Sequence, residues 1–106
     1  AIHPDGTAGK REVYCSFPRS CPDGLAFDTD QNLYVSCYSP NYIYKISPNQ
    51  EVHLLIDDWE AHGLCNPTNL AFGGKNFNEL YAANLGAWHI SKIKLNAIGQ
   101  KLACHL

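Results

Sequence analysis

The chain has 106 residues, of which 45% are hydrophobic and 17% are charged, and its formal net charge is −2. A chain of this length has the bulk of one small domain, and its eight Lys and Arg residues are scattered instead of forming one basic stripe. These properties argue against nucleic acid and a membrane as partners, because no apolar stretch approaches the roughly 18 residues of a membrane-spanning helix.

The predicted elements are all β-strands. The first, residues 12–17 (EVYCSF), is an extra N-terminal strand. Short runs rich in Val, Ile, Tyr and Leu follow, separated by turn-forming segments such as DTDQN and SPNQ. Four strands are predicted in a first unit, at residues 25–28, 33–37, 43–46 and 52–56. Four more are predicted in a second unit, at residues 69–72, 80–83, 90–94 and 101–104.

The two units are copies of one repeat. PDGLAF, from Pro22, recurs as PTNLAF, from Pro67, after 45 places. NLYVSCY recurs as ELYAANL after 47 places, and YIYKIS (residues 42–47) falls on HISKIK (residues 89–94) at the same shift. Three strands that recur in the same order at this spacing indicate a β-propeller blade or a similar array. We therefore predict one all-β domain over residues 1–106, made of two four-stranded blades (21–64 and 65–106), with residues 1–20 supplying the outer strand of a preceding blade.

Two blades alone leave two apolar faces uncovered, and repeat units need neighbours for stability. We therefore expect the remainder of a longer chain, or a homo-oligomer, to complete the ring. The five cysteines show no spacing that suits a zinc site, so we expect reduced thiols at half-buried strand positions. Reduced thiols favour a cytoplasmic location.

The runs PDGLAFDTDQNLYVSCY (residues 22–38) and PTNLAFGGKNFNELYAAN (residues 67–84) resemble the C-terminal half of the regucalcin (senescence marker protein)/gluconolactonase family. The resemblance implies a six-bladed propeller that holds one divalent metal at the mouth of its central channel and hydrolyses lactones or related esters. Calcium is the first expectation for the metal, and zinc or manganese are alternatives. Three copies of a two-blade chain would make six blades, so a trimer is the favoured oligomer.

In that family, the aspartate of the PDG motif is a metal ligand and the proposed general base. Carried over by the motif, that residue is Asp23, whereas the family's glutamate and asparagine ligands have no counterpart in this chain. The residues alone leave another reading open, in which Pro22 and Asp23 form a turn that enters a strand. Tyr38 and Asn84 end the second strand of each blade and are candidates for lining a substrate pocket, or else for strand-end packing and turn formation.

Two further acidic segments of the sequence do not match a known binding site. Asp28, Asp30 and Asn32 look like the start of a calcium loop, but the required glycine and glutamate are missing, so a hairpin turn is predicted. The acidic connector at residues 57–60 is expected to be solvated and without a specific role.

The resemblance implies a segment of a metal-dependent lactone or ester hydrolase, with a small-molecule lactone as substrate. With one ligand, the chain is expected to be inactive alone and to need oligomerisation or the missing blades. The alternative is a non-catalytic binding or assembly module that keeps the blades for their surfaces.

Overall fold

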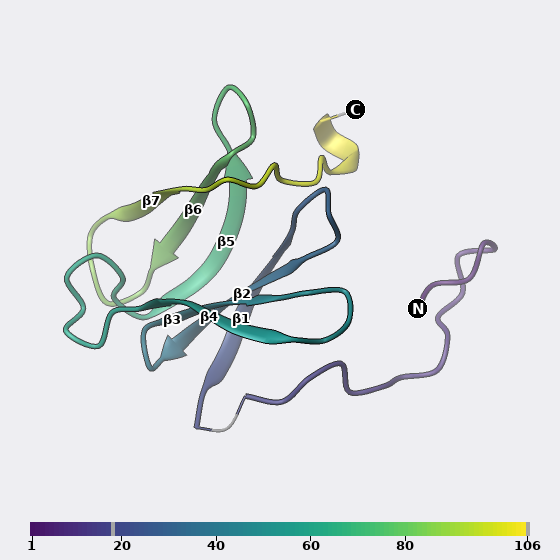
Figure 1. The fold of residues 1–106 in the computed structure, drawn as a ribbon, viewed down its shortest axis with the longest axis horizontal. Helices are drawn as coiled ribbons and strands as arrows, with labels where there is room; N and C mark the ends of the chain where they lie inside the picture. Colours follow the sequence, from purple (N-terminus) through teal and green to yellow (C-terminus); the bar gives the residue numbers. More distant parts are fainter. Residues whose placement is uncertain (18, 106) are drawn as a thin grey trace.

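The structure is a computed structural model that describes residues 1–17 and 19–105. Seven strands form two antiparallel sheets that lie next to each other (Figure 1). The first sheet contains, in spatial order, β1 (Cys21–Phe27), β2 (Leu33–Ser39), β3 (Tyr42–Ile46) and β4 (Val52–Asp57). The second contains β5 (Pro67–Gly73), β6 (Glu79–Asn84) and β7 (Ile90–Lys94).

This architecture confirms the all-β prediction, and two antiparallel sheets of meander order are consistent with propeller blades. The one helical element is η1 (Ala103–His105), a single 3₁₀ turn, within the described residues. None of the described residues belongs to a helix long and apolar enough to cross a membrane.

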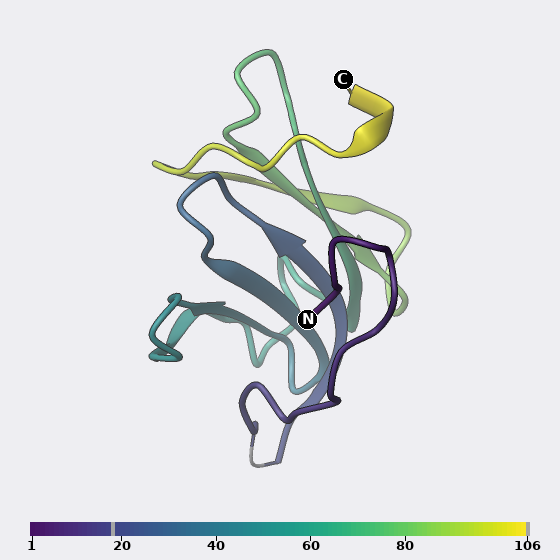
Figure 2. The same cartoon turned by 90° about the vertical axis from the view of Figure 1, so that its right-hand side faces the viewer.

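The predicted N-terminal strand does not form within this chain. Residues 12–17 form no strand, because no strand edge lies beside them to accept their backbone hydrogen bonds. Two of their side chains pack instead on the outer face of the first sheet, where the ring of Phe17 lies 4.8 Å from that of Tyr44 and Cys15 contacts the same apolar cluster. Figures 1 and 2 show this segment running outside both sheets.

The last predicted strand, residues 101–104, is also wrong. After β7 the chain turns back across the end of β1, where Gln100 N–H donates to the Phe27 carbonyl (2.9 Å) and Thr29 N–H donates to that of Ile98 (2.8 Å). These bonds direct residues 98–102 away from the outer edge of β7. The second sheet therefore has three strands instead of four.

The main core lies between the two sheets. Side chains alternate along a strand, so Tyr34 of β2 faces the second sheet and Val35 faces the opposite side. The Tyr34 ring meets Phe72 of β5 edge to face, with 5.2 Å between centroids. The rest of this core is buried aliphatic side chains, namely Ile43, Leu64, Leu70, Leu80 and Ala82.

The β1–β2 turn is built around a buried acid, which confirms the predicted hairpin turn. Asp28 is only 1% exposed, and its Oδ1 accepts hydrogen bonds from the backbone N–H groups of Asp30 (3.0 Å) and Asn32 (2.9 Å). Its Oδ2 accepts from the Tyr34 hydroxyl at 3.1 Å. Burial, and secondarily the charge of Asp28, raises the pKa of Tyr34 well above its usual range, so this hydroxyl stays a donor.

No disulfide joins the five cysteines, all of which lie in the described part of the chain, so the expectation of free thiols holds in the structure. The expected half-buried strand positions are not found, because Cys21 and Cys37 lie in strands but are exposed and buried respectively. The half-buried cysteines, Cys15 and Cys65, lie outside the strands. Cys37 is fully buried, and burial raises its pKa to about 11, so it behaves as a small apolar side chain.

Strand β1 of the first sheet comes close to β5 of the second sheet at Gly24. A Cβ atom at this position would lie 2.5 Å from the Cα of Asn69 and 2.8 Å from the carbonyl oxygen of Thr68, both in β5. Its N–H also donates to the Ser36 hydroxyl at 3.1 Å. The glycine of the PDG motif is therefore required for the two sheets to pack.

We expect Gly24→Ala to lower the free energy of unfolding by about 1–3 kcal/mol, because backbone atoms of β5 cannot give way without separating the sheets. Urea unfolding measures the change. Gly63→Ala is the matched control, since its nearest neighbour would be 3.4 Å away, an ordinary contact. Equal losses in the two variants would contradict the assignment.

Candidate functional site

Asp23 lies inside β1, one residue before the Gly24 contact. The β1–β2 register shifts between Pro22 and Leu25, so Asp23 and Gly24 form an irregularity in the ladder. Such bulges change the direction in which a side chain points and are common beside active sites. The structure therefore places the PDG motif within a strand, not in a turn that precedes one.

The Asp23 carboxylate is exposed, and no described residue is hydrogen-bonded to it. This distinguishes it from Asp28, whose oxygens are occupied by four protein donors. An exposed, unoccupied carboxylate at the start of an innermost strand can accept a proton or bind a cation.

Tyr38 lies beside Asp23, at the end of β2, and is 40% exposed. Its pKa is raised, first by a hydrogen bond with the Cys21 side chain, then by the charge of Cys21 and burial, and last by the charge of Asp23. The structure thus brings together two of the three candidate residues, Asp23 and Tyr38, and adds Cys21, which sequence reasoning did not single out as a site residue.

Asn84 ends β6, as expected, but its side chain is bonded within the protein. Its Oδ1 accepts from Cys65 N–H (2.9 Å), and its Nδ2 donates to the His89 carbonyl (3.1 Å) and the Ser91 hydroxyl (2.8 Å). These bonds connect the loop before β5 to the β6–β7 turn, which is the turn-forming role that the sequence left open. That Asn84 lines a substrate pocket stays a prediction.

A hydrogen-bonded network that sequence reasoning missed holds the loops at this end of the sheets. Asn66 donates from Nδ2 to the Tyr38 carbonyl (2.7 Å), and its N–H donates to Asn41 Oδ1 (2.8 Å). Asn41 in turn donates to the Asp58 carbonyl (3.0 Å). No sequence signal marks this network, because the positive φ of Asn66 (51°) is visible only in the structure.

The expectation that the acidic connector at residues 57–60 has no specific role is wrong for Asp58. Its carboxylate accepts from the backbone N–H groups of Gly63 (2.6 Å), Leu64 (2.7 Å) and His62 (3.1 Å). These bonds, led by the one from Leu64, lower the pKa of Asp58. They anchor Leu64, which is buried in the core between the sheets.

The described residues do not complete a metal site. No group of three or more His, Cys, Asp or Glu side chains among them could hold a metal ion. Calcium takes six to eight oxygen ligands, and Asp23 supplies at most two of them. A metal at Asp23 would therefore need ligands from outside this part of the chain.

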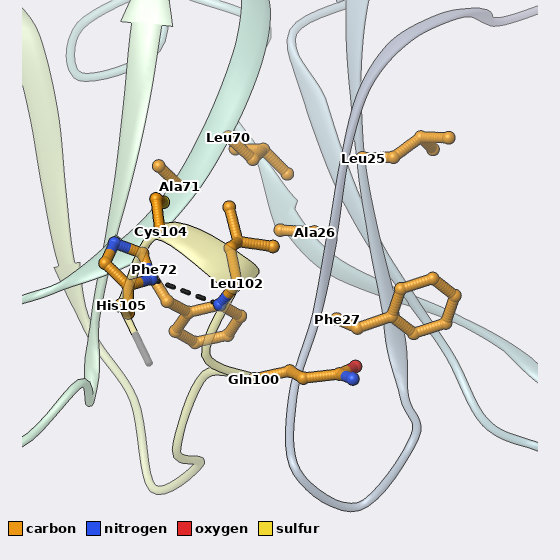
Figure 3. Close-up of a pocket in the computed structure, with 10 residues that line it drawn as sticks. All are labelled: Leu25, Ala26, Phe27, Leu70, Ala71, Phe72, Gln100, Leu102, Cys104 and His105. Carbon is orange, nitrogen blue, oxygen red and sulfur yellow. Dashed lines mark hydrogen bonds between the residues drawn. The ribbon is translucent and has the colours of Figure 1, made fainter.

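A larger hollow than the one that reaches Asp23 lies between β1, β5 and the C-terminal segment (Figure 3). It has a volume of about 520 Å³, and Asp23 is not among the residues that line it. Its walls are mainly apolar, including Leu25, Phe27, Leu70, Phe72 and Leu102. A smaller hollow of about 310 Å³ reaches Asp23 and is otherwise lined by side chains such as Tyr14, Phe17 and Leu25.

Comparison with known proteins gives a consistent family assignment. The family model described as "SMP-30/Gluconolactonase/LRE-like region" matches residues 2–85. Regucalcin from Gallus gallus is 31% identical over 81 residues, which cover 71% of this chain and 24% of the relative. Regucalcin from Danio rerio is 30% identical over 81 residues (76% and 26%), and that from Oryctolagus cuniculus is 32% identical over 80 residues (70% and 24%).

The chain thus spans about a quarter of the length of the curated relatives it matches. No solved structure matches it significantly.

We expect Asp58→Ala to lower the melting temperature at pH 7 and to have a smaller effect as the pH falls through the lowered pKa of Asp58. The folded-state pKa of Asp58 is lowered, so its stabilisation is fully present above the ordinary value of 3.8 and is lost as the pH falls through the lowered value. Thermal melts of both proteins from pH 7 to pH 2 measure this. Asp57→Ala is the control, and a difference between wild type and Asp58→Ala that does not shrink with acid would disprove the assigned role.

Proposed function

The chain belongs to the SMP-30/gluconolactonase/LRE-like family, and on this basis we propose that it is a segment of a metal-dependent lactone or ester hydrolase to which it contributes Asp23. The observation that carries the proposal is the free carboxylate of Asp23, held at an irregularity of an innermost strand. Three features together support a site residue: Asp23 stands at a strand irregularity, it lies beside the contact of β1 with β5, and protein donors do not occupy its oxygens as they do those of Asp28.

Asp23 would act as a general base. A carboxylate within hydrogen-bond reach of a water molecule can take its proton as the water attacks the carbonyl carbon of a lactone. The ring C–O bond to that carbon then breaks, and the departing oxygen receives the proton from the carboxyl group. In this proposal, Tyr38 of the neighbouring strand β2 would donate a hydrogen bond from its hydroxyl to the same substrate. The small hollow beside Asp23 is mostly apolar, which suits the ring of a small lactone.

A divalent metal would polarise the carbonyl of the substrate and stabilise the negative charge that develops on its oxygen. Calcium is the first candidate, because Asp23 is an oxygen ligand, and zinc or manganese are alternatives. Since the described residues supply too few ligands, the metal requires further residues from the missing blades or from other copies. The isolated chain is therefore inactive in this proposal.

The second candidate function is a non-catalytic binding or assembly module. The hollow of about 520 Å³ favours it, because its walls are mainly apolar and carry no carboxylate (Figure 3). Such a surface can hold an apolar ligand or a protein segment without any metal.

We expect Asp23→Asn to weaken calcium binding at least about tenfold, because even residues that only support metal ligands cost 10–100-fold when replaced. Equilibrium dialysis at increasing protein concentration measures it, since binding should appear only as copies associate. Asp30→Asn is the matched control, being an exposed aspartate in the β1–β2 turn that leaves the site unchanged.

Hydrolysis of a lactone and of an aryl ester is measured with the same three proteins. The dilute wild-type chain should hydrolyse neither faster than Asp23→Asn does. Calcium binding that is equal in wild type and Asp23→Asn would reject Asp23 as a ligand, and would favour the binding module.

A further inference from the structure

No strand of the described chain pairs with the outer edge of β7. In the sequence repeat, residues 89–94 correspond to residues 42–47, which include β3. The outer edge of β3 is paired with β4, from Tyr42 opposite Asp57 to Ile46 opposite Val52. The same edge of β7 pairs with nothing in the described chain, and Ile90, at its start, is 67% exposed.

Residues 12–17 are the complementary feature, because they have a strand-forming sequence and no strand partner. Val13 is 84% exposed, and the Glu12 side chain is mostly exposed as well. The segment lies over the outer face of the first sheet, where Phe17 packs on Tyr44 and the Tyr14 hydroxyl donates to the Ser47 carbonyl at 3.5 Å. Adjacent blades of a propeller pack face to face in this way.

The C-terminal segment of the same copy does not fill the edge of β7. Residues 98–100 are bonded to the other sheet, through the bridge between Gly99 and Asp28 and the bond from Gln100 to Phe27. An open edge of backbone N–H and C=O groups is a site for strand addition. A second copy of this chain offers a free segment of the right kind.

We propose that residues 12–17 of one copy add to β7 of a second copy as its fourth, antiparallel strand. The antiparallel direction places Glu12 near Lys94 and Phe17 near the exposed Ile90, so the ends pair by charge and by apolar contact. Lys94 is exposed and forms no ion pair with another described residue, and the Glu12 pair with Lys10 is a weak surface contact of 3.9 Å. The contacts of Phe17 with its own first sheet are retained.

Each copy then has two four-stranded sheets. The interface is head to tail, so it repeats from copy to copy until the ring closes, and three copies would supply six sheets. A closed ring is also what the proposed hydrolase needs, because it would bring ligands from several sheets to one axis. The association itself does not depend on the proposed function and is tested without metal.

Light scattering over a wide concentration range, with no metal present, measures the association. The wild-type chain should rise from the monomer mass to a multiple of it. Neighbouring residues of a strand send their N–H groups to opposite sides, so either Val13→Pro or Tyr14→Pro removes a ladder hydrogen bond and should weaken association about tenfold or more. Val13→Ala is the control, and circular dichroism checks that each variant is folded.

Charge reversal tests the direction of pairing. Glu12→Lys and Lys94→Glu should each weaken association about two- to fivefold, and the double variant should recover it. Hydrogen exchange should show protection of the β7 amides that grows with protein concentration.

A wild-type chain that stays monomeric, or proline variants that both associate normally, would overturn the proposal. So would association without new protection in β7, which would place the contact elsewhere. Protection of β7 by an unrelated extended peptide, with no self-association, would replace the second copy by a peptide partner. Asp23→Asn should associate as the wild type does, so failure of the assembly and failure of the proposed function are distinguishable.

Discussion

The close approach of β1 and β5 at Gly24 is the constraint on which the rest of the structure depends. Only a residue without a side chain lets the two backbones come this near, with the Cα of Asn69 2.5 Å from where a Cβ would stand. This contact brings the inner strands of the two sheets side by side and lets Tyr34 and Phe72 meet in the core. It also holds Asp23, the preceding residue, beside the junction of the sheets, where residues from more than one sheet can converge.

Several polar side chains around this junction form hydrogen bonds within the protein, whereas the Asp23 carboxylate is exposed to solvent. Asp28 and Asp58 use their carboxylates to hold a hairpin turn and a loop, and Asn41 and Asn66 connect that loop to β2. These interactions stabilise loops whose backbone groups would otherwise lack partners. The Asp23 carboxylate takes no part in them and is open to solvent, so it is available to the ligand of the proposed function.

The same structure is incomplete at its edges. One sheet lacks a fourth strand, the N-terminal segment lacks a sheet, and apolar side chains such as Leu25 and Phe27 remain exposed. Because the chain spans about a quarter of its relatives, such surfaces are where further blades or copies would pack. The calcium ion of the proposed function has the same requirement, because it would need six or more oxygen ligands, so the proposed site would be completed only where the sheets are completed.

The sequence by itself determined the repeat, seven of the nine predicted strands and the hairpin turn at Asp28. These features depend on the local patterning of apolar and turn-forming residues, whereas the same patterning left Pro22 and Asp23 open as a turn that the structure places inside β1. Only the tertiary structure decided that residues 12–17 and 101–104 form no strand, since a strand requires a partner edge and EVYCSF carries no record of whether one is present. The same reason explains Asp58 and Asn84, whose roles come from backbone groups far along the chain or in positive-φ loops that composition does not reveal. Local sequence thus specifies strands and turns, whereas pairing, and with it the use of each polar side chain, is a property of the folded chain.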